Sequence, residues 1–558
     1  MSGAGEISPA GMTDGAPHLL ITAREAYPVF EALVLGAQRR VSMSFRVFDL
    51  RTRLHSAAGL AIGNTWADLL ADALRRGVSL RLVIADFDPI GAAELHRSTW
   101  RTMRQCAGLR EIAGKVGTGA LEVIAARHPA RIGAVPSGLF WPVAAWRLRK
   151  AARMLNDLTP DERRRFLSEA PRLRPNLKVE EGAEGRVRAD FAHRFRMTPV
   201  THHQKLAVID GRRLYVGGLD LDERRWDTPT HDQPARETWH DVQMVFDEPE
   251  LVAQAERHLE GFLEQSAGEG PAPEGRGTAA PAGGSRFLTT ISEPARFAPF
   301  RFSPRTRSSG IFDAHLARTG EARRLIFLET QYFRDRRLAR ALARRGREEP
   351  GLHLVMVLPA APEEVAFSSG GTDARYGEFL QSRCLRAVRK AFGDRFIALS
   401  PAQRRRPGRP EEEAGDEAVG APDGSDDPAH GRSVLLGAPV IYVHAKLSVF
   451  DDRAAIISSA NLNGRSLRWD TEAGVEMSDP ATVAMIRGRV LDHWYPGLAE
   501  GRRAEMLDPA RAFGAWVAAA RRDAARPPEA REGYLLPYDM RPGRRFGMAV
   551  FGVPEEMV

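Results

Sequence analysis

The sequence predicts an α/β fold built from two similar halves. Two regions of the chain repeat the order strand, helix, strand, which is typical of parallel βαβ units. The same short polar motif follows that pattern once in each region, and a stretch rich in Pro, Gly and Ala separates the two regions. At about 150 residues per domain, 558 residues can form two large units. We therefore expect an internal duplication.

Apolar periodicity locates the repeated elements. The expected strand, helix and strand are 41–49, 66–76 and 80–86 in the first region and 323–333, 337–345 and 352–358 in the second. Residues 269–285 (EGPAPEGRGTAAPAGGS) and 403–433 cannot bury enough apolar surface to pack. The predicted organisation is an N-terminal tail (1–21), a first half (22–268), a linker (269–285), a second half (286–500) with a disordered insertion (403–433), and a C-terminal extension (501–558).

Composition excludes several classes of protein. Apolar residues make up 43% and charged residues 27%, which rules out a wholly disordered chain or a fibre. No apolar run approaches the roughly 20 residues that span a bilayer, and the first residues lack the pattern of a secretory signal. We expect a cytoplasmic protein that can bind a membrane peripherally, with export by a signal-independent route left open. Cys106 and Cys384 have no metal-ligand or disulfide spacing, so both should be buried free thiols.

Positive charge is carried almost entirely by arginine. The chain has 80 Lys and Arg against 72 Asp and Glu, for a net charge of +8, and only six of the 80 are lysines. Such a bias is typical of a GC-rich genome, so arginine clusters are weak evidence for a nucleic-acid partner. Each lysine, in contrast, stands out.

Two of those lysines belong to a repeated motif, HxKx4D. Its members are His203, Lys205 and Asp210 in the first half and His444, Lys446 and Asp451 in the second. About 0.01 such motifs are expected by chance in a chain of this composition. A pair of β-hairpins with surface His and Lys is the alternative, but a matched pair of motifs argues against it. In each copy a strand should follow the Lys, and a small-residue turn should follow that hairpin, with Gly217 in one half and Ser458 in the other.

This residue set suits displacement at a phosphodiester. One imidazole can attack phosphorus, while the other protonates the leaving oxygen and then activates water or an alcohol. Two ammonium groups can stabilise the non-bridging oxygens, so no metal or other cofactor is required. Each motif has one His, so the halves should pack face to face around one shared active site.

The doubled motif resembles that of the phospholipase D superfamily over about residues 22–500, most closely the eukaryotic-type phospholipases D. The stretches that carry the resemblance are 217–221 (GGLDL), 225–227 (RWD), 239–241 (WHD), 329–333 (ETQYF, with Thr330 where the family has Asn), and 459–466 (SANLNGRS) with Glu472. The resemblance implies two mixed sheets flanked by helices.

The resemblance also implies roles for the site residues. His203 would be the nucleophile and His444 the general acid and base, with Glu472 orienting His203 and Asp241 orienting His444. Ser459 and Asn461 would contact phosphate. Asp210 and Asp451 complete the motif, and we predict that they act structurally at the strand ends. Asp220 stands where many relatives have Asn, and we assign it no phosphate contact because a carboxylate would repel phosphate.

The predicted function is a phospholipase D-type phosphodiesterase that hydrolyses or transfers a phospholipid head group. The alternatives are a cardiolipin synthase-like phosphatidyltransferase and a nuclease of the same superfamily. A non-catalytic binding protein is disfavoured because all six motif residues are intact. The expected partner is phospholipid at a membrane surface, with nucleic acid ranked second. Residues 139–150 (LFWPVAAWRLRK) could sit at a membrane interface or pack as a core helix.

Overall fold

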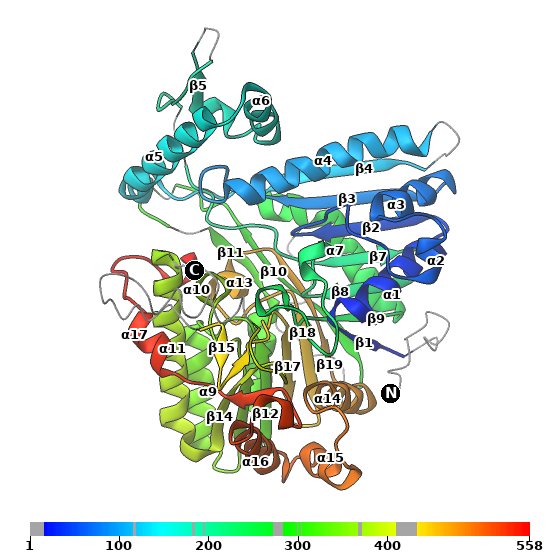
Figure 1. Cartoon of the computed structure of the whole chain (residues 1–558), viewed down its shortest axis with the longest axis vertical. Coiled ribbons are helices and arrows are strands. Elements are labelled where there is room, and N and C mark those ends of the chain that lie inside the picture. Colours follow the sequence, from blue (N-terminus) through cyan, green and yellow to red (C-terminus); the bar gives the residue numbers. More distant parts are fainter. Residues whose placement is uncertain are drawn as a thin grey trace.

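The computed structural model describes residues 16–114, 119–180, 185–193, 196–271, 283–297, 299–302, 304–366, 371–408 and 432–558. Two large sheets, each flanked by helices, form the body of the molecule (Figure 1). Short strand pairs add β5 (Leu177–Val179) with β6 (Val187–Ala189) and β15 (Val434–Leu435) with β16 (Ala438–Pro439). The α/β fold class predicted from sequence is confirmed.

The first sheet has seven strands. Their order is β1 (His18–Ile21), β9 (Val242–Phe246), β8 (Arg213–Gly217), β7 (Leu206–Ile209), β2 (Arg40–Phe45), β3 (Ser79–Asp86) and β4 (Leu121–Arg127). Strands β2, β3 and β4 are parallel and the other pairs are antiparallel, so the sheet is mixed. The accompanying helices are α1 (Thr22–Gly36), α2 (Ala57–Leu60), α3 (Trp66–Arg75), α4 (Ala93–Ala113) and α7 (Pro249–Ala267).

The second sheet has nine strands and repeats this plan. Their order is β11 (Arg305–Ser309), β10 (Ser285–Glu293), β19 (Glu472–Met477), β18 (Ala454–Ser458), β17 (Lys446–Phe450), β12 (Leu325–Thr330), β13 (His353–Val357), β14 (Phe396–Pro401) and β20 (Leu535–Pro537). Its helices are α8 (Gly310–Glu321), α9 (Arg336–Glu348), α10 (Glu363–Ala366), α11 (Thr372–Phe392), α13 (Gly464–Arg468), α14 (Pro480–Trp494), α15 (Glu500–Leu507), α16 (Ala512–Ala524) and α17 (Arg541–Phe546).

The two sheets share a topology. Strands β2, β3 and β4 are parallel, as are β12, β13 and β14, and the hairpin β7–β8 followed by β9 matches β17–β18 followed by β19. The predicted elements at 41–49, 66–76 and 80–86 correspond to β2, α3 and β3, and those of the second half to β12, α9 and β13. Local sequence explains the boundaries: Asp335 caps α9 by accepting a hydrogen bond from the Leu338 backbone at 2.6 Å.

The inner faces of the sheets meet in one hydrophobic core. Leu206 and Val208 of β7 belong to the same buried cluster as Leu447 and Val449 of β17, together with residues of α7 and α14. The intervening Ala207 points to the other face of the first sheet, against α1 and α3. Successive side chains along each strand therefore point to opposite faces of its sheet, and both faces are buried. One buried face of each sheet packs against that of the other, which joins the halves face to face.

Two predicted segment assignments differ from the structure. Residues 18–21, assigned to an N-terminal tail, form β1, because Leu19 and Ile21 are apolar and pair with β9. Residues after 500 are not a separate extension, since β20 pairs with β14 and α16 packs on the shared core. Most of the predicted linker (272–282) and of the predicted insertion (409–431) lies outside the described residues.

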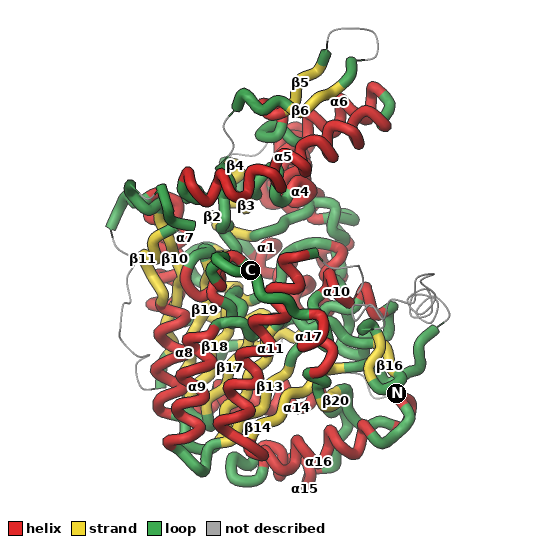
Figure 2. Tube along the Cα trace, turned by 90° about the vertical axis from the view of Figure 1, so that its left-hand side faces the viewer, coloured by secondary structure: helices red, strands yellow, loops and turns green. Residues whose placement is uncertain are grey.

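A small lobe rises from the first half. It consists of α5 (Ala134–Asp157), α6 (Pro160–Glu169), β5 and β6, which have their own hydrophobic cluster (Figure 2). Cys106 and Cys384 are buried free thiols, as predicted. Within the described part of the chain, no helix is both long and apolar enough to cross a membrane.

Candidate active site

Backbone hydrogen bonds between the halves bring the two motifs together. The His203 N–H donates to the Thr471 carbonyl at 2.8 Å, and the Thr471 N–H donates to the Thr201 carbonyl at 3.0 Å. The second motif repeats this exchange: the His240 N–H donates to Tyr442 O at 2.8 Å, and the His444 N–H donates to His240 O at 2.7 Å. Each motif histidine is therefore anchored by a segment of the other half, as one shared site requires.

Each motif imidazole contacts an acid of the opposite half. His203 Nδ1 lies 3.1 Å from Glu472 Oε2, and His444 Nδ1 lies 2.6 Å from Asp241 Oδ2. A hydrogen bond from Nδ1–H to the acid leaves Nε2 of each ring with its lone pair. The structure thus places Glu472 and Asp241 where the family resemblance implies.

The motif lysines lie directly beside these rings. Lys205 Nζ donates to His203 O at 2.6 Å and lies 3.8 Å from a carboxylate oxygen of Asp220. Lys446 Nζ donates to His444 O and lies 2.9 Å from His444 Nδ1. Both lysine side chains are buried. The sequence analysis did not identify Asp220 as the partner of Lys205.

Burial disfavours charge on the motif histidines and lysines and on the two acids that contact the histidines. It holds the pKa of His203 and His444 well below the usual value of imidazole, and the nearby lysines add to the effect. Burial also lowers the pKa of Lys446 to about 7 and raises the pKa of Glu472 to about 8. A phosphate anion between the lysines would supply the opposite charge that these ammonium groups need.

Asp210 and Asp451 stabilise the strand ends. Asp210 accepts hydrogen bonds from the backbone N–H groups of residues 38, 39 and 40, each at 2.8 Å, at the start of β2. Asp451 accepts from the N–H groups of residues 323, 324 and 325 at the start of β12, at 2.8–2.9 Å. Both residues adopt φ of +55°, which Asp tolerates better than most side chains. Their carboxylates contact backbone at the strand ends, which assigns them a structural place in the motif.

Ser459 and Asn461 have partners within the site. Ser459 Oγ donates to Glu472 Oε2, while Asn461 Nδ2 donates to Gln331 Oε1 at 3.0 Å. Gln331 in turn donates to the Tyr442 hydroxyl at 2.7 Å. Asn461 Oδ1 is buried and has no hydrogen-bond partner within the described residues. Ser459 therefore helps to orient Glu472, and phosphate contact by Ser459 and Asn461 stays a prediction.

Arginines and an aromatic ring complete the surroundings. The Trp239 ring contacts both the Arg225 guanidinium, 3.7 Å from its centroid, and the His444 ring, with 4.6 Å between the centroids. Arg46 Nη1 lies 3.9 Å from Asp220 Oδ2, and both Arg46 and Arg465 contribute to the low pKa of His203. Arg46 follows β2 and belongs to no motif, so no sequence pattern predicts its place near the site. Arg225 and Arg465 lie in the motifs quoted above, which could have suggested them.

Three comparisons relate the chain to known proteins. The family model described as "Cardiolipin synthase, PLD-like domain" matches residues 428–494. Phospholipase D zeta 1 of Arabidopsis thaliana is 51% identical over 45 residues, which are 8% of this chain and only 4% of the plant protein.

Among solved structures, phosphatidylserine synthase of Haemophilus influenzae is similar with a TM-score of 0.45 and 11% identity, covering 90% of this chain and 94% of that chain. Polyphosphate kinase of Porphyromonas gingivalis is similar with a TM-score of 0.39 and 11% identity, covering 86% and 46%. The family model, taken with the doubled motif in one site, identifies the class. The match covers the second motif of the chain, and it supports membership of the phospholipase D superfamily.

Proposed function

We propose that the protein hydrolyses a phospholipid head group, or transfers the phosphatidyl group to an alcohol, through a phosphohistidine intermediate. The observation that carries this proposal is the pair of imidazoles, each held by an acid of the other half and each next to a buried lysine. A low pKa keeps His203 neutral, as a nucleophile must be.

In the first step, His203 Nε2 forms a bond to phosphorus while the bond to the head-group oxygen breaks. The leaving oxygen takes a proton from His444, whose pKa rises when the anionic phosphate enters beside it. In the second step, His444 removes a proton from water or an alcohol, whose oxygen attacks phosphorus and releases His203. Lys205 and Lys446 stabilise the phosphoryl oxygens in both steps.

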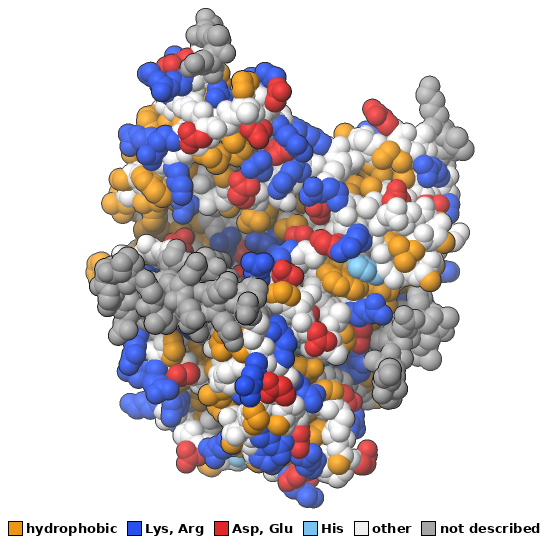
Figure 3. Space-filling model, in the orientation of Figure 1, with side chains coloured by type: hydrophobic (Ala, Val, Ile, Leu, Met, Phe, Trp, Pro, Cys, Tyr) orange, Lys and Arg blue, Asp and Glu red, His pale blue; other side chains and the backbone are white. Residues whose placement is uncertain are grey.

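The face of α5 supports a lipid substrate. Leu139, Val143 and Trp146 recur at helical spacing and have exposed fractions of 71%, 48% and 53%, whereas Ala144 and Leu148 face the core of the lobe. Basic residues flank this face, and Figure 3 shows hydrophobic side chains beside Lys and Arg over the lobe. An apolar stripe bordered by positive charge is typical of helices that lie at a membrane surface.

A loop beside the start of α5 carries another exposed apolar side chain. Phe300 is 75% exposed, and its neighbours Pro299 and Arg301 accept backbone hydrogen bonds from the start of α5. We propose that this surface, Leu139, Val143, Trp146 and Phe300, binds the membrane peripherally and delivers lipid to the site.

Mass spectrometry of products from mixed phospholipid vesicles, with and without ethanol, tests the proposal. Phosphatidic acid should form without ethanol, and phosphatidylethanol should appear with it, because a covalent intermediate accepts any alcohol that fits. The His203→Ala variant is the control, and single-stranded DNA is assayed in parallel. Cleavage of DNA without any lipid product would favour the nuclease alternative and refute the proposal.

A further inference from the structure

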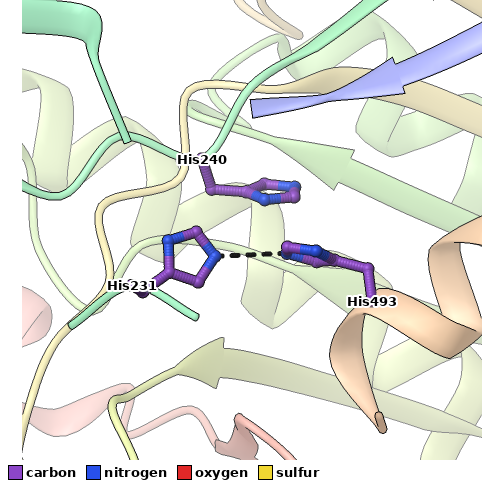
Figure 4. A group of neighbouring side chains, drawn as sticks. All are labelled: His231, His240 and His493. Atoms are coloured by element: carbon purple, nitrogen blue, oxygen red, sulfur yellow. Dashed lines mark hydrogen bonds between the residues drawn. The ribbon is translucent and has the colours of Figure 1, made fainter. Parts of the chain in front are cut away.

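Three histidines that the proposed reaction does not use lie close together in the fold. His231, His240 and His493 are all buried, and one ring nitrogen of each lies within 4.8 Å of the other two (Figure 4). His231 and His240 belong to the first half, whereas His493 lies near the end of α14 in the second. No short motif links these residues, and the sequence analysis did not identify them as a group.

Two carboxylates determine which nitrogens are free. Asp227 Oδ2 lies 2.7 Å from His231 Nδ1, and Glu329 Oε1 contacts His240 Nε2. A carboxylate only accepts hydrogen bonds, so these two nitrogens carry the protons. His231 Nε2 and His240 Nδ1 are consequently left with lone pairs.

The free nitrogens are arranged as ligands of a metal ion would be. His231 Nε2 lies 3.2 Å from His493 Nε2. Two nitrogens bound to one tetrahedral ion at about 2.0–2.1 Å would be about 3.3 Å apart. His240 Nδ1 is buried and finds no hydrogen-bond partner anywhere in the described chain. A hydrogen-bonded pair of rings would explain the first contact but would leave that third nitrogen unsatisfied.

The surroundings match the usual support of a metal site. A metal-bound histidine commonly donates its second N–H to a carboxylate, which is the arrangement of Asp227 with His231 and of Glu329 with His240. Glu329 is itself oriented by the indole N–H of Trp494, at 3.0 Å. Two carboxylates in this shell would offset the charge of a divalent ion in a buried place.

We propose that His231, His240 and His493 bind a divalent metal ion that prefers imidazole ligands, with Zn²⁺ as the best match. Because its ligands come from both halves, the ion would cross-link them. His240 also accepts hydrogen bonds through its carbonyl from the backbone of His444 and Ala445. The ion would therefore stabilise the position of the second motif and take no part in phosphoryl transfer.

The test is metal analysis of the full-length protein purified from zinc-supplemented medium and passed over a chelating resin. We expect about one Zn²⁺ per chain. X-ray absorption should show nitrogen ligands with the outer-shell scattering of imidazole. This readout does not depend on activity, so it is independent of the proposed function. A folded protein that contains no stoichiometric metal and gives no Co²⁺ ligand-field spectrum would overturn the proposal.

Variants locate the ion. The His493→Ala variant should lose the metal, whereas His493→Cys should bind Co²⁺ with a new thiolate charge-transfer band, which a purely structural histidine could not produce. The matched control is His315→Asn, which changes a buried histidine bonded to Ile311 O and Ser448 Oγ, and it should keep the ion. Undiminished metal content in folded His493→Ala would place the ion elsewhere. If neither His493 variant folds, the wild-type absorption spectrum decides.

Discussion

The two halves differ in the side chain that follows each motif lysine at the same spacing. Asp220 and Asn461 each follow their motif histidine by 17 residues, so they occupy matching places in the two halves. Asp220 brings a carboxylate within 3.8 Å of Lys205, whereas the second half has an amide at the matching position. Asp220 is the leading influence that raises the pKa of Lys205 against burial.

The two lysines therefore differ in how their positive charge is balanced. Lys205 has Asp220 within ion-pair distance, but Lys446, whose pKa is lowered by burial to about 7, has no carboxylate at that distance among the described residues. The second half therefore has the greater need for an anion. An amide at this position would not repel a bound phosphate, and the Asn461 side chain is buried.

The two halves also differ in how they hold their acids. A side chain on Gly218 would have its Cβ 2.2 Å from Asp241 Oδ1, so glycine is required for Asp241 to reach His444. At the matching position the second half has Ser459, which donates to Glu472. The first half makes room for its acid, and the second half hydrogen-bonds to its acid.

The largest effect should come from the histidines. His203→Asn should lower turnover of a soluble phosphodiester by at least about 10⁴-fold and should abolish the covalent adduct. His444→Asn should lose a similar factor with a poor leaving group but still form adduct slowly with a good one, because such a group needs little protonation. Rapid-quench labelling measures the adduct. Labelled adduct in His203→Asn would reverse the two roles, and His315→Asn is the control for folding.

Arginine at either lysine position should lower the rate by at least about a hundredfold. Both ammonium groups are buried against their own motif histidines, and a planar guanidinium would displace the imidazole beside it. Turnover of Lys205→Arg and Lys446→Arg is measured on a soluble phosphodiester, with thermal unfolding as the check on folding. A near-normal rate in one variant would mean that the two halves do not contribute equally to one phosphate pocket.

Asp220→Asn should make the first half resemble the second. Without its counter-ion, Lys205 should have a still lower pKa, because Asp220 is the leading group that opposes the effect of burial. Since a lysine must be protonated to stabilise phosphate, kcat/KM should begin to fall at a lower pH in the variant than in the unmodified protein. The pH profile of kcat/KM is compared with that of Glu223→Gln, which changes an exposed acid paired with Arg53. An unchanged alkaline limb would show that Asp220 does not control the charge of Lys205.

Local sequence patterns predict the repeated strands and helices and the motif residues of the site. The βαβ periodicity located β2, α3 and β3 together with their counterparts, because each element is short and strongly apolar. The HxKx4D spacing predicted a shared site, since each copy holds a single histidine. The acids Glu472 and Asp241 depended on family resemblance, because 269 and 203 residues separate them from the histidines that they contact.

The unpredicted part depends on contacts that no local pattern encodes. Strand β20 is only three residues long, and its pairing with β14 becomes visible only in the folded chain. The cluster of His231, His240 and His493 joins residues up to 262 positions apart. The approach of Lys205 to Asp220 likewise follows from the fold, and no sequence pattern predicts it.

The smallest effect on chemistry, and a clear difference in stability, should come from the motif aspartates. In Asp210→Asn and Asp451→Asn, the new amide group would face a backbone N–H donor, which costs about 1–3 kcal/mol where water cannot compensate. Asp451 is 6% exposed, whereas Asp210 is more accessible to water, so Asp451→Asn should lower the free energy of unfolding more. Urea unfolding at pH 7 measures this difference, with Asp452→Asn, an exposed neighbour, as the control. Both motif variants should keep near-normal turnover at low temperature, because their carboxylates accept hydrogen bonds from the backbone where β2 and β12 begin. Equal losses of stability would mean that burial does not distinguish the two strand ends. A loss of turnover in a fully folded variant would mean that these aspartates take part in the chemistry of the site.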